Sequence, residues 1–134
     1  MSDATAAVRG AVQLSRIGQI AVNVRDVKRA IAFYRDVLGM EFLFEVPRMG
    51  FFNCDGIRLM LAEAESPESD HPASIVYYGV DDIQQTYDTL SQRGVEFVAP
   101  PRLIATVADH ELWMAFFRDC ECNVLGLMSE VPRV

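Results

Sequence analysis

The stretch GQIAVNVRDV at residues 18–27 decides the fold, because it recurs in altered form as SIVYYGVDDI at residues 74–83. In the first copy apolar residues alternate with polar or small ones: Ile20, Val22 and Val24 against Gln19, Ala21 and Asn23. This period is typical of a strand that packs one face on a helix. The other face of such a strand usually meets solvent, but the remaining sequence favours a pocket there.

A helix is predicted directly after this strand, in DVKRAIAFYRDVLG at residues 26–39. Its apolar side chains recur at helical spacing, at Val27, Ile31, Tyr34 and Leu38. Asp26 is the expected N-cap, and Gly39 is the expected left-handed residue that ends the helix. A strand at 40–46 and a hairpin that turns at Asn53 to Gly56 complete the unit.

The second half of the chain repeats this order, with a strand at 74–80, a helix at 81–94, a strand at 95–99 and a hairpin at 110–128. GMEFL at 39–43 matches GVEFV at 94–98. The turn NCDG at 53–56 matches DCEC at 119–122 with a shift of 66 residues. The sequence therefore predicts an α+β fold of two tandem βαβββ modules.

The predicted organisation is a flexible N-terminal tail at 1–16, a first module at 17–63, a linker at 64–73 and a second module at 74–130. The two modules are expected to form one domain. With 134 residues and 51% apolar content, the chain can bury a core without disulfides or structural metal. Its three cysteines, Cys54, Cys120 and Cys122, form no even disulfide framework and no strong zinc pattern, so reduced thiols are expected.

Charge and hydropathy exclude two classes of partner. Twelve Lys and Arg against nineteen Asp and Glu give a net charge of −7. That is the wrong sign for a phosphate backbone, so no nucleic-acid partner is expected. No apolar run approaches the roughly 20 residues that cross a bilayer, so no membrane partner is expected and the predicted location is cytoplasmic.

Two blocks carry a resemblance: DVKRAIAFYRDVLGMEF at 26–42 and AFFRDCECNVLGL at 115–127. They resemble the vicinal oxygen chelate superfamily of glyoxalases, bleomycin-resistance proteins and extradiol dioxygenases. The resemblance covers residues 17–130. It implies paired modules whose sheets curl around a cleft, and commonly a homodimer.

The resemblance also implies where a metal would bind. In metal-dependent members, the first and last strands of each module each supply one ligand, and the corresponding positions here are Gln19, Ile75, Met60 and Gly126. Only Gln19 offers an oxygen, whereas a divalent cation requires three or four His, Cys, Asp or Glu donors. We therefore predict that the metal site of this superfamily is lost, and no other cofactor is predicted.

The residues of the cleft follow from the last hairpin. If Asp119 and Asn123 flank a three-residue loop, Phe116 faces Gly126 and Met114 faces Met128. The predicted cleft face of the second module is His110, Leu112, Met114, Phe116, Gly126 and Met128, joined by Ile75 and Tyr77. The predicted contribution of the first module is Gln19, Ala21, Asn23, Arg58 and Met60. The back of the hairpin, Trp113, Ala115, Phe117, Leu125 and Leu127, should pack on a helix.

Mostly apolar walls with a few directed polar groups are typical of a small-molecule site. The leading hypothesis is a protein that binds a small, partly apolar organic molecule, by sequestration as in bleomycin-resistance proteins. The alternative is a metal-free lyase, isomerase or epimerase, with His110 as general acid or base and Gln19 or Tyr77 polarising a carbonyl. A third interpretation is a protein-interaction module. Whether the protein is an enzyme stays open at this point.

Each candidate also has a purely structural interpretation. Gln19 fits an ordinary hydrogen-bonded strand residue, His110 a satisfied strand-end histidine, and Arg58 a solvated surface cation. The methionines fit simple packing. Glu111 should point away from His110 because successive strand residues face opposite sides. Cys122 stands where the turn of this superfamily usually has glycine, so backbone strain is expected there.

Overall fold

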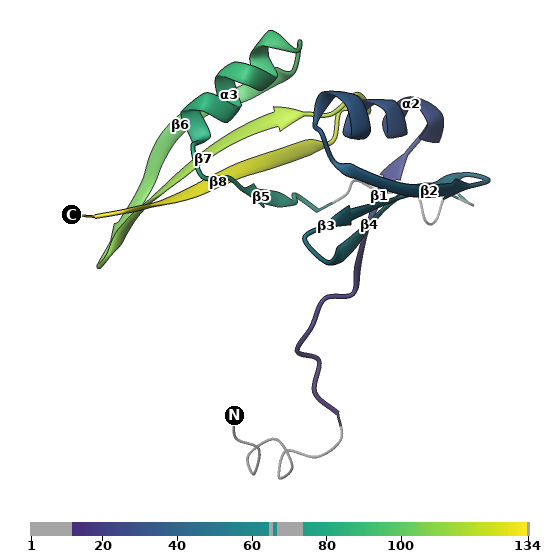
Figure 1. Cartoon of the computed structure of the whole chain (residues 1–134), viewed down its shortest axis with the longest axis horizontal. Coiled ribbons are helices and arrows are strands. Elements are labelled where there is room, and N and C mark those ends of the chain that lie inside the picture. The colour runs from purple at the N-terminus through teal and green to yellow at the C-terminus, as the bar shows by residue number, and fades with distance from the viewer. Residues whose placement is uncertain (1–11, 65, 67–73, 134) are drawn as a thin grey trace.

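A computed structural model describes residues 12–64, 66 and 74–133 (Figure 1). The first module contains β1 (Gln19–Val24), α2 (Val27–Ala32), the π-helical turn η1 (Phe33–Val37), β2 (Glu41–Val46), β3 (Met49–Cys54) and β4 (Ile57–Glu63). The second contains β5 (Tyr77–Gly79), α3 (Ile83–Gln92), β6 (Glu96–Val107), β7 (His110–Arg118) and β8 (Val124–Pro132). The predicted α+β fold of two βαβββ modules is confirmed. The predicted linker falls almost entirely outside the described residues.

Each module forms one mixed sheet, and the two sheets have the same strand order. The orders are β1-β4-β3-β2 and β5-β8-β7-β6. The first strand of each pairs in parallel with the last, with Ala21 opposite Met60 and Tyr77 opposite Gly126. These two pairs occupy equivalent places, so the repeat found in the sequence is also a repeat in space.

The helix boundaries follow the predicted signals. The Asp26 carboxylate accepts a hydrogen bond from the Arg29 amide at 3.2 Å, and Asp82 does the same for Gln85 at 3.0 Å. Each cap satisfies an amide that the first helical turn leaves without a partner. Gly39 has φ +75°, as expected for a residue that ends a helix.

Three predicted boundaries were wrong. The helix expected at 26–39 is α for only six residues and then widens into η1. The strand expected at 74–80 is only three residues long, because β5 pairs with β8 over Tyr77–Gly79 alone. The strand expected at 95–99 continues through Val107, with register shifts along its pairing with β7. Those irregularities break the period that sequence reasoning uses.

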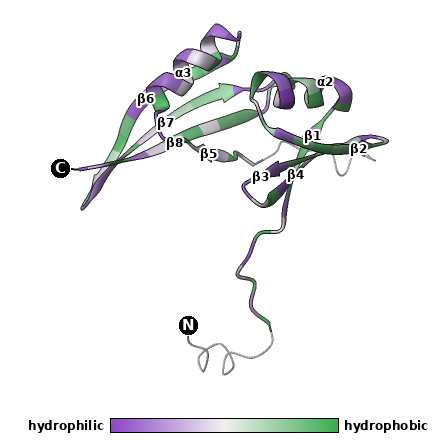
Figure 2. Ribbon diagram, viewed as in Figure 1, coloured by the Kyte–Doolittle hydropathy of each residue, from purple (hydrophilic) through white to green (hydrophobic). Residues whose placement is uncertain are grey.

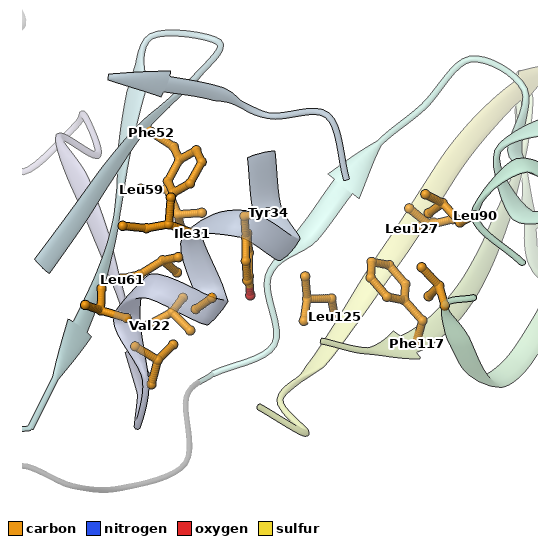
Figure 3. Close-up of a cluster of buried hydrophobic side chains, with 14 of the residues drawn as sticks. Val22, Ile31, Tyr34, Phe52, Leu59, Leu61, Leu90, Phe117, Leu125 and Leu127 are labelled. Carbon is orange, nitrogen blue, oxygen red and sulfur yellow. The ribbon is translucent and has the colours of Figure 1, made fainter. Parts of the chain in front are cut away.

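One hydrophobic core runs through both modules (Figure 3). In the first module Val22, Ile31 and Leu59 are buried between β1, α2 and β4. Tyr34 lies between this group and Leu125 at the start of β8. Burying each such side chain contributes about 1.5–3 kcal/mol. The shared core makes the modules one packing unit.

Each helix covers one face of its sheet, and the other face is left open. Helices α2 and α3 lie on the same side of the molecule in Figure 1. The outer surface of α3 is mostly hydrophilic, whereas β7 is largely hydrophobic (Figure 2). We call the uncovered side of each sheet its open face. No helix among the described residues is long and apolar enough to span a membrane.

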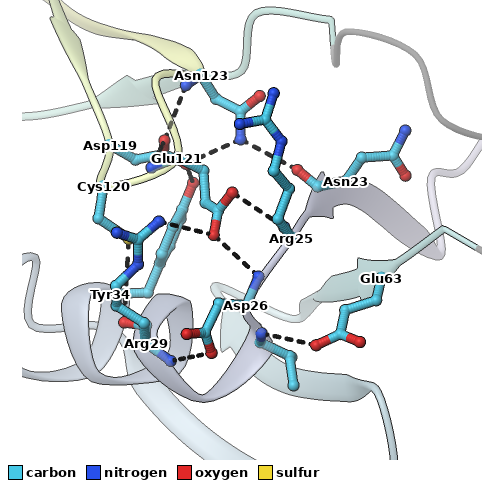
Figure 4. A network of polar contacts seen from close by, with 11 residues as sticks. Asn23, Arg25, Asp26, Arg29, Tyr34, Glu63, Asp119, Cys120, Glu121 and Asn123 are labelled. Atoms are coloured by element: carbon cyan, nitrogen blue, oxygen red, sulfur yellow. Dashed lines mark hydrogen bonds and ion pairs between the residues drawn. The ribbon is translucent and has the colours of Figure 1, made fainter.

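The turn between β7 and β8 joins the modules through a buried carboxylate (Figure 4). Asp119, 5% exposed, accepts a hydrogen bond from the hydroxyl of Tyr34 at 2.7 Å. It also accepts from the amides of Glu121 and Asn123, each at 2.8 Å, and from Asn123 Nδ2 at 3.1 Å. Burial and the adjacent carboxylate raise the pKa of Tyr34, so its hydroxyl remains a donor.

Glu121 extends from the same turn to the start of α2. Its carboxylate accepts hydrogen bonds from the amides of Arg25 at 2.9 Å and Asp26 at 3.0 Å. The guanidinium of Arg29 adds an ion pair at 3.1 Å. Asn123 Nδ2 also donates to the carbonyl of Asn23 at 3.2 Å. The second module therefore supplies a carboxylate to the N-terminal end of the helix of the first.

The strain expected at Cys122 is present, since this residue has φ +66°. We expect Cys122→Gly to raise the free energy of unfolding by about 1 kcal/mol, because glycine adopts positive φ without a Cβ clash. Cys122→Ala keeps the Cβ and serves as the matched control, with little expected gain. Urea unfolding of both variants checks the prediction, and equal stability of the two would contradict it.

Candidate functional site

The open face of the second module has the predicted register. Phe116 pairs with Gly126 and Met114 with Met128, as the three-residue loop requires. The alternate residues of the same strands face α3, and Ala115, Phe117, Leu125 and Leu127 are buried there. The predicted division between cleft face and back is therefore the division that the strands make.

Tyr77 packs directly on Gly126. A Cβ atom at position 126 would lie 2.6 Å from Cδ2 of Tyr77, closer than atoms can approach. The Tyr77 ring meets the Phe116 ring edge to face, with 5.7 Å between their centroids. An aromatic ring thus fills the space beside a position where the superfamily places a metal ligand.

We expect Gly126→Ala to lower the free energy of unfolding by about 1–3 kcal/mol, because the new methyl group must displace the Tyr77 ring. Gly79→Ala is the matched control, because Gly79 lies on the neighbouring strand and a Cβ there would meet nothing within 4 Å. Thermal unfolding of the two variants measures the difference. Equal effects would mean that the Tyr77 ring does not depend on the glycine.

The open face of the first module brings three predicted residues together. Gln19 pairs with Arg58 across β1 and β4, and the Gln19 amide contacts the Met60 sulfur at 3.8 Å. The Arg58 guanidinium lies over the Phe51 ring, 5.8 Å from its centroid. Phe51 in turn stacks on Phe44 at 4.6 Å. This face therefore carries aromatic surface beside one amide and one cation.

Sequence reasoning missed Phe44 and Phe51. The pairing rule that placed Phe116 opposite Gly126 also places Phe51 opposite Met60, as observed. Phe51 could therefore have been found from the turn at 53–56. Phe44 could not, because the pairing of β2 with β3 shifts between Phe42 and Phe44.

Asn23 lies at the end of β1 opposite Ala62, where its carbonyl accepts the bond from Asn123. It is thus at the junction between the modules and also on the strand that carries Gln19. The predicted set falls into two groups, one on each sheet. Gln19, Arg58 and Met60 form the first, and Tyr77, Met114, Phe116 and Met128 form the second.

His110 stands apart from both groups, at the start of β7. Six strand residues separate it from Phe116, which is about 20 Å. Its Nδ1 lies 2.8 Å from Asp109 Oδ1 and its Nε2 lies 3.8 Å from Glu130 Oε2. The hydrogen bond from His110 is the main cause that lowers the pKa of Asp109. Glu111 faces the other side, as predicted, and accepts a hydrogen bond from Trp113.

The three cysteines are free thiols. Burial raises the pKa of Cys54 and of Cys120, which disfavours the thiolate. Cys120 also contacts the carbonyl of Arg29 at 3.9 Å. These features fit the structural role expected from the sequence.

The side chains at the four ligand positions do not fit a metal ion. The amide of Gln19 and the thioether of Met60 are neighbours, but neither is a strong ligand for a hard cation. Ile75 and Gly126 provide no side-chain donor. Among residues 12–64, 66 and 74–133, no three His, Cys, Asp or Glu side chains are grouped to hold a metal.

Similar proteins share this fold. The chain is 28% identical over 109 residues to the metallothiol transferase FosB of Staphylococcus epidermidis and 30% identical to that of Staphylococcus haemolyticus. Each match covers 81% of this chain but only 63% of the relative, so the chain spans less than two thirds of these curated relatives.

Solved structures agree in fold. A glyoxalase/bleomycin resistance protein/dioxygenase from Nocardioides superposes with a TM-score of 0.74 at 18% identity, covering 96% of this chain and 91% of that one. A lactoylglutathione lyase from Agrobacterium tumefaciens superposes with a TM-score of 0.70 at 20% identity, covering 88% and 96%. A family model matches residues 16–106. The chain therefore belongs to the glyoxalase/bleomycin resistance protein/dioxygenase superfamily.

Proposed function

We propose that this protein binds a small, partly apolar organic molecule on its open faces, as a homodimer and without a metal. The observation that carries the proposal is the Tyr77 ring on Gly126, edge to face with Phe116. It replaces a metal ligand with aromatic surface, which favours shape and stacking as the means of recognition. A cytoplasmic location remains a prediction from the sequence.

The side chains around these positions support the same interpretation. Met60, Met114 and Met128 supply flexible apolar contacts that adapt to varied ligand shapes. Gln19 and Arg58 supply directed polar groups on the first sheet. A binder that sequesters its ligand requires such walls and requires no group that performs chemistry.

The staphylococcal relatives are named metallothiol transferases. A thiol transfer at a metal needs ligands that Gln19, Met60 and Gly126 do not offer. We therefore do not extend that activity to this chain. Elemental analysis of protein purified without chelator should find no stoichiometric nickel, zinc or manganese, and a metal lost in Gln19→Ala would overturn the proposal.

Exposed apolar side chains support the homodimer. Phe44, Val46 and Tyr77 are each more than two fifths exposed on the open faces. A second copy that covers these faces would remove them from water. Sedimentation equilibrium should show a dimer that Phe44→Glu weakens, whereas Val12→Glu, in the segment before β1, should leave it intact.

Methionine methyl groups provide the direct test of binding. The chain has six methionines, and Met60, Met114 and Met128 lie on the open faces. Met40 packs against the core on the other side and serves as an internal control. NMR of ¹³C-methyl methionine during titration with small aromatic fragments should shift the open-face signals and not Met40. Shifts confined to Met40, or no shifts, would count against the proposal.

The second candidate is the metal-free enzyme, which the position of His110 between Asp109 and Glu130 favours. Such neighbours orient an imidazole for proton transfer. The distance of about 20 Å along the strand separates it from the aromatic group on Gly126. His110→Ala should leave fragment binding unchanged if the protein is only a binder.

A further inference from the structure

The second module is larger than the first along three strands. β6, β7 and β8 have 12, 9 and 9 residues, against 6, 6 and 7 in β2, β3 and β4. The extra length extends past the start of α3 (Figure 1). A cavity of about 440 Å³ lies where this extension meets the first turn of α3.

The walls of this cavity are apolar and its rim is acidic. Ile83, Pro101, Trp113 and Val131 provide the apolar surface. The Trp113 indole donates a hydrogen bond from Nε1 to Glu111 Oε1 at 3.1 Å, which fixes the ring in the wall. The cavity lies on the helix side of the sheet, opposite the open face, so it is separate from the site proposed above.

Three carboxylates, those of Asp81, Asp82 and Glu111, line the cavity, and no Lys or Arg is among its lining residues. The Asp82 side chain already caps the amide of Gln85. Glu111 uses one oxygen for the Trp113 indole and has a second oxygen available. The charge of the rim therefore complements a cation, and it opposes an anion at the start of the helix.

The first module shows what is missing here. There, Glu63 accepts a hydrogen bond from the Val27 amide at 3.0 Å and forms an ion pair with Arg48 at 3.4 Å. The shift of 66 residues places Ser129 at the equivalent position. Its hydroxyl reaches only the carbonyl of Asp81 at 3.4 Å. A short side chain in place of Glu63 leaves space, and no basic side chain corresponding to Arg48 lines the cavity.

We propose that this cavity binds a small organic cation with an aromatic or aliphatic body. The body packs on Trp113, Pro101 and Val131, and the positive charge lies between the indole face and the carboxylates. Indole is the best aromatic partner for a cation, and quaternary ammonium groups are often bound in this way. The cavity volume lies within the range of small-molecule sites, roughly 300–1,000 Å³.

The test uses the single tryptophan of the chain as its reporter. Trp113 fluorescence and its indole N–H signal in NMR are followed during titration with benzyltrimethylammonium chloride. Benzyl alcohol and benzoate serve as the neutral and anionic counterparts. We expect a saturable response to the cation alone. Absence of saturation, or equal responses to the three probes, would overturn the proposal.

Two charge-matched variants test the site itself. Glu111→Gln retains an oxygen for the Trp113 indole but removes the charge, and should weaken binding of the probe by about tenfold. Asp55→Asn removes one charge at the turn of the first module, where asparagine also accepts positive φ, and should leave binding unchanged. Equal weakening by both variants would mean a general charge effect and would refute the site. Phe116→Ala, on the open face, should leave the response intact.

Discussion

Replacing Asp119 with alanine should lower the free energy of unfolding by about 3–4 kcal/mol. The variant loses an acceptor for four donors and leaves the hydroxyl of Tyr34, which is fully buried, without a partner. A buried donor without an acceptor cannot recover its bond from water, and that asymmetry accounts for most of the effect. Urea unfolding, followed by circular dichroism, measures the loss.

Two further variants separate the interaction from the turn. Tyr34→Phe removes one donor and should destabilise by about 1–2 kcal/mol. Asp119→Asn preserves the shape of the turn and removes the charge. A double-mutant cycle between Tyr34→Phe and Asp119→Asn should give a coupling energy above 0.5 kcal/mol, as contacting residues usually do. An Asp119→Ala loss below about 1 kcal/mol would mean that the turn carries little of the energy that joins the modules.

Replacing Glu121 with alanine should lower the free energy of unfolding by about 2–3 kcal/mol near neutral pH. The carboxylate is only 4% exposed and serves two amides at the start of α2 as well as Arg29. The amides account for most of the effect, because the Arg29 side chain is 57% exposed and its ion pair is screened by water. Thermal and urea unfolding check the value.

The same residue makes stability depend on pH. Burial alone would raise the pKa of Glu121, but hydrogen bonds from Arg25, Asp26 and Arg29 outweigh it and hold the pKa below the usual 4.5. A carboxyl with a lowered pKa in the folded state stabilises fully above its unfolded value. That contribution disappears as pH falls through the folded value. The wild type should therefore lose stability below pH 4.5, the usual value of this carboxyl.

Glu121→Gln isolates that effect, since its amide retains an acceptor and does not titrate in this range. The stability difference between wild type and Glu121→Gln should shrink as pH falls from 6 to about 3. Asp36→Asn is the control, because Asp36 also has a lowered pKa, next to Arg35, but is exposed to solvent. A constant difference across this range would contradict the role given to Glu121.

Much of the fold could be predicted from local residues. Asp26 and Asp82 predicted both helix starts, because a side-chain cap acts within one turn. The turn at 119–122 predicted the register of Phe116 and Gly126, because a short loop fixes the pairing of the strands beside it. The repeat itself followed from alignment of the two halves. Each of these signals depends on neighbours in sequence.

The junction between modules could not be predicted. Asp119 and Glu121 read as ordinary turn residues, while their partners Tyr34 and Arg25 lie 85 and 96 residues away. No local pattern specifies such a pair. Phe44 was missed for a related reason, because a register shift in β2 changes the face of a strand without a mark in the sequence. The length of β6 was missed in the same way.

The junction also constrains the order in which the chain can become stable during synthesis. The first helix begins at Val27, yet the carboxylate that meets its leading amides belongs to Glu121. A ribosome that has released only the first module exposes a helix whose start must be hydrated until nearly a hundred further residues appear. Contacts of such long separation slow folding. We expect the early half to stay loosely formed until the last hairpin closes over it.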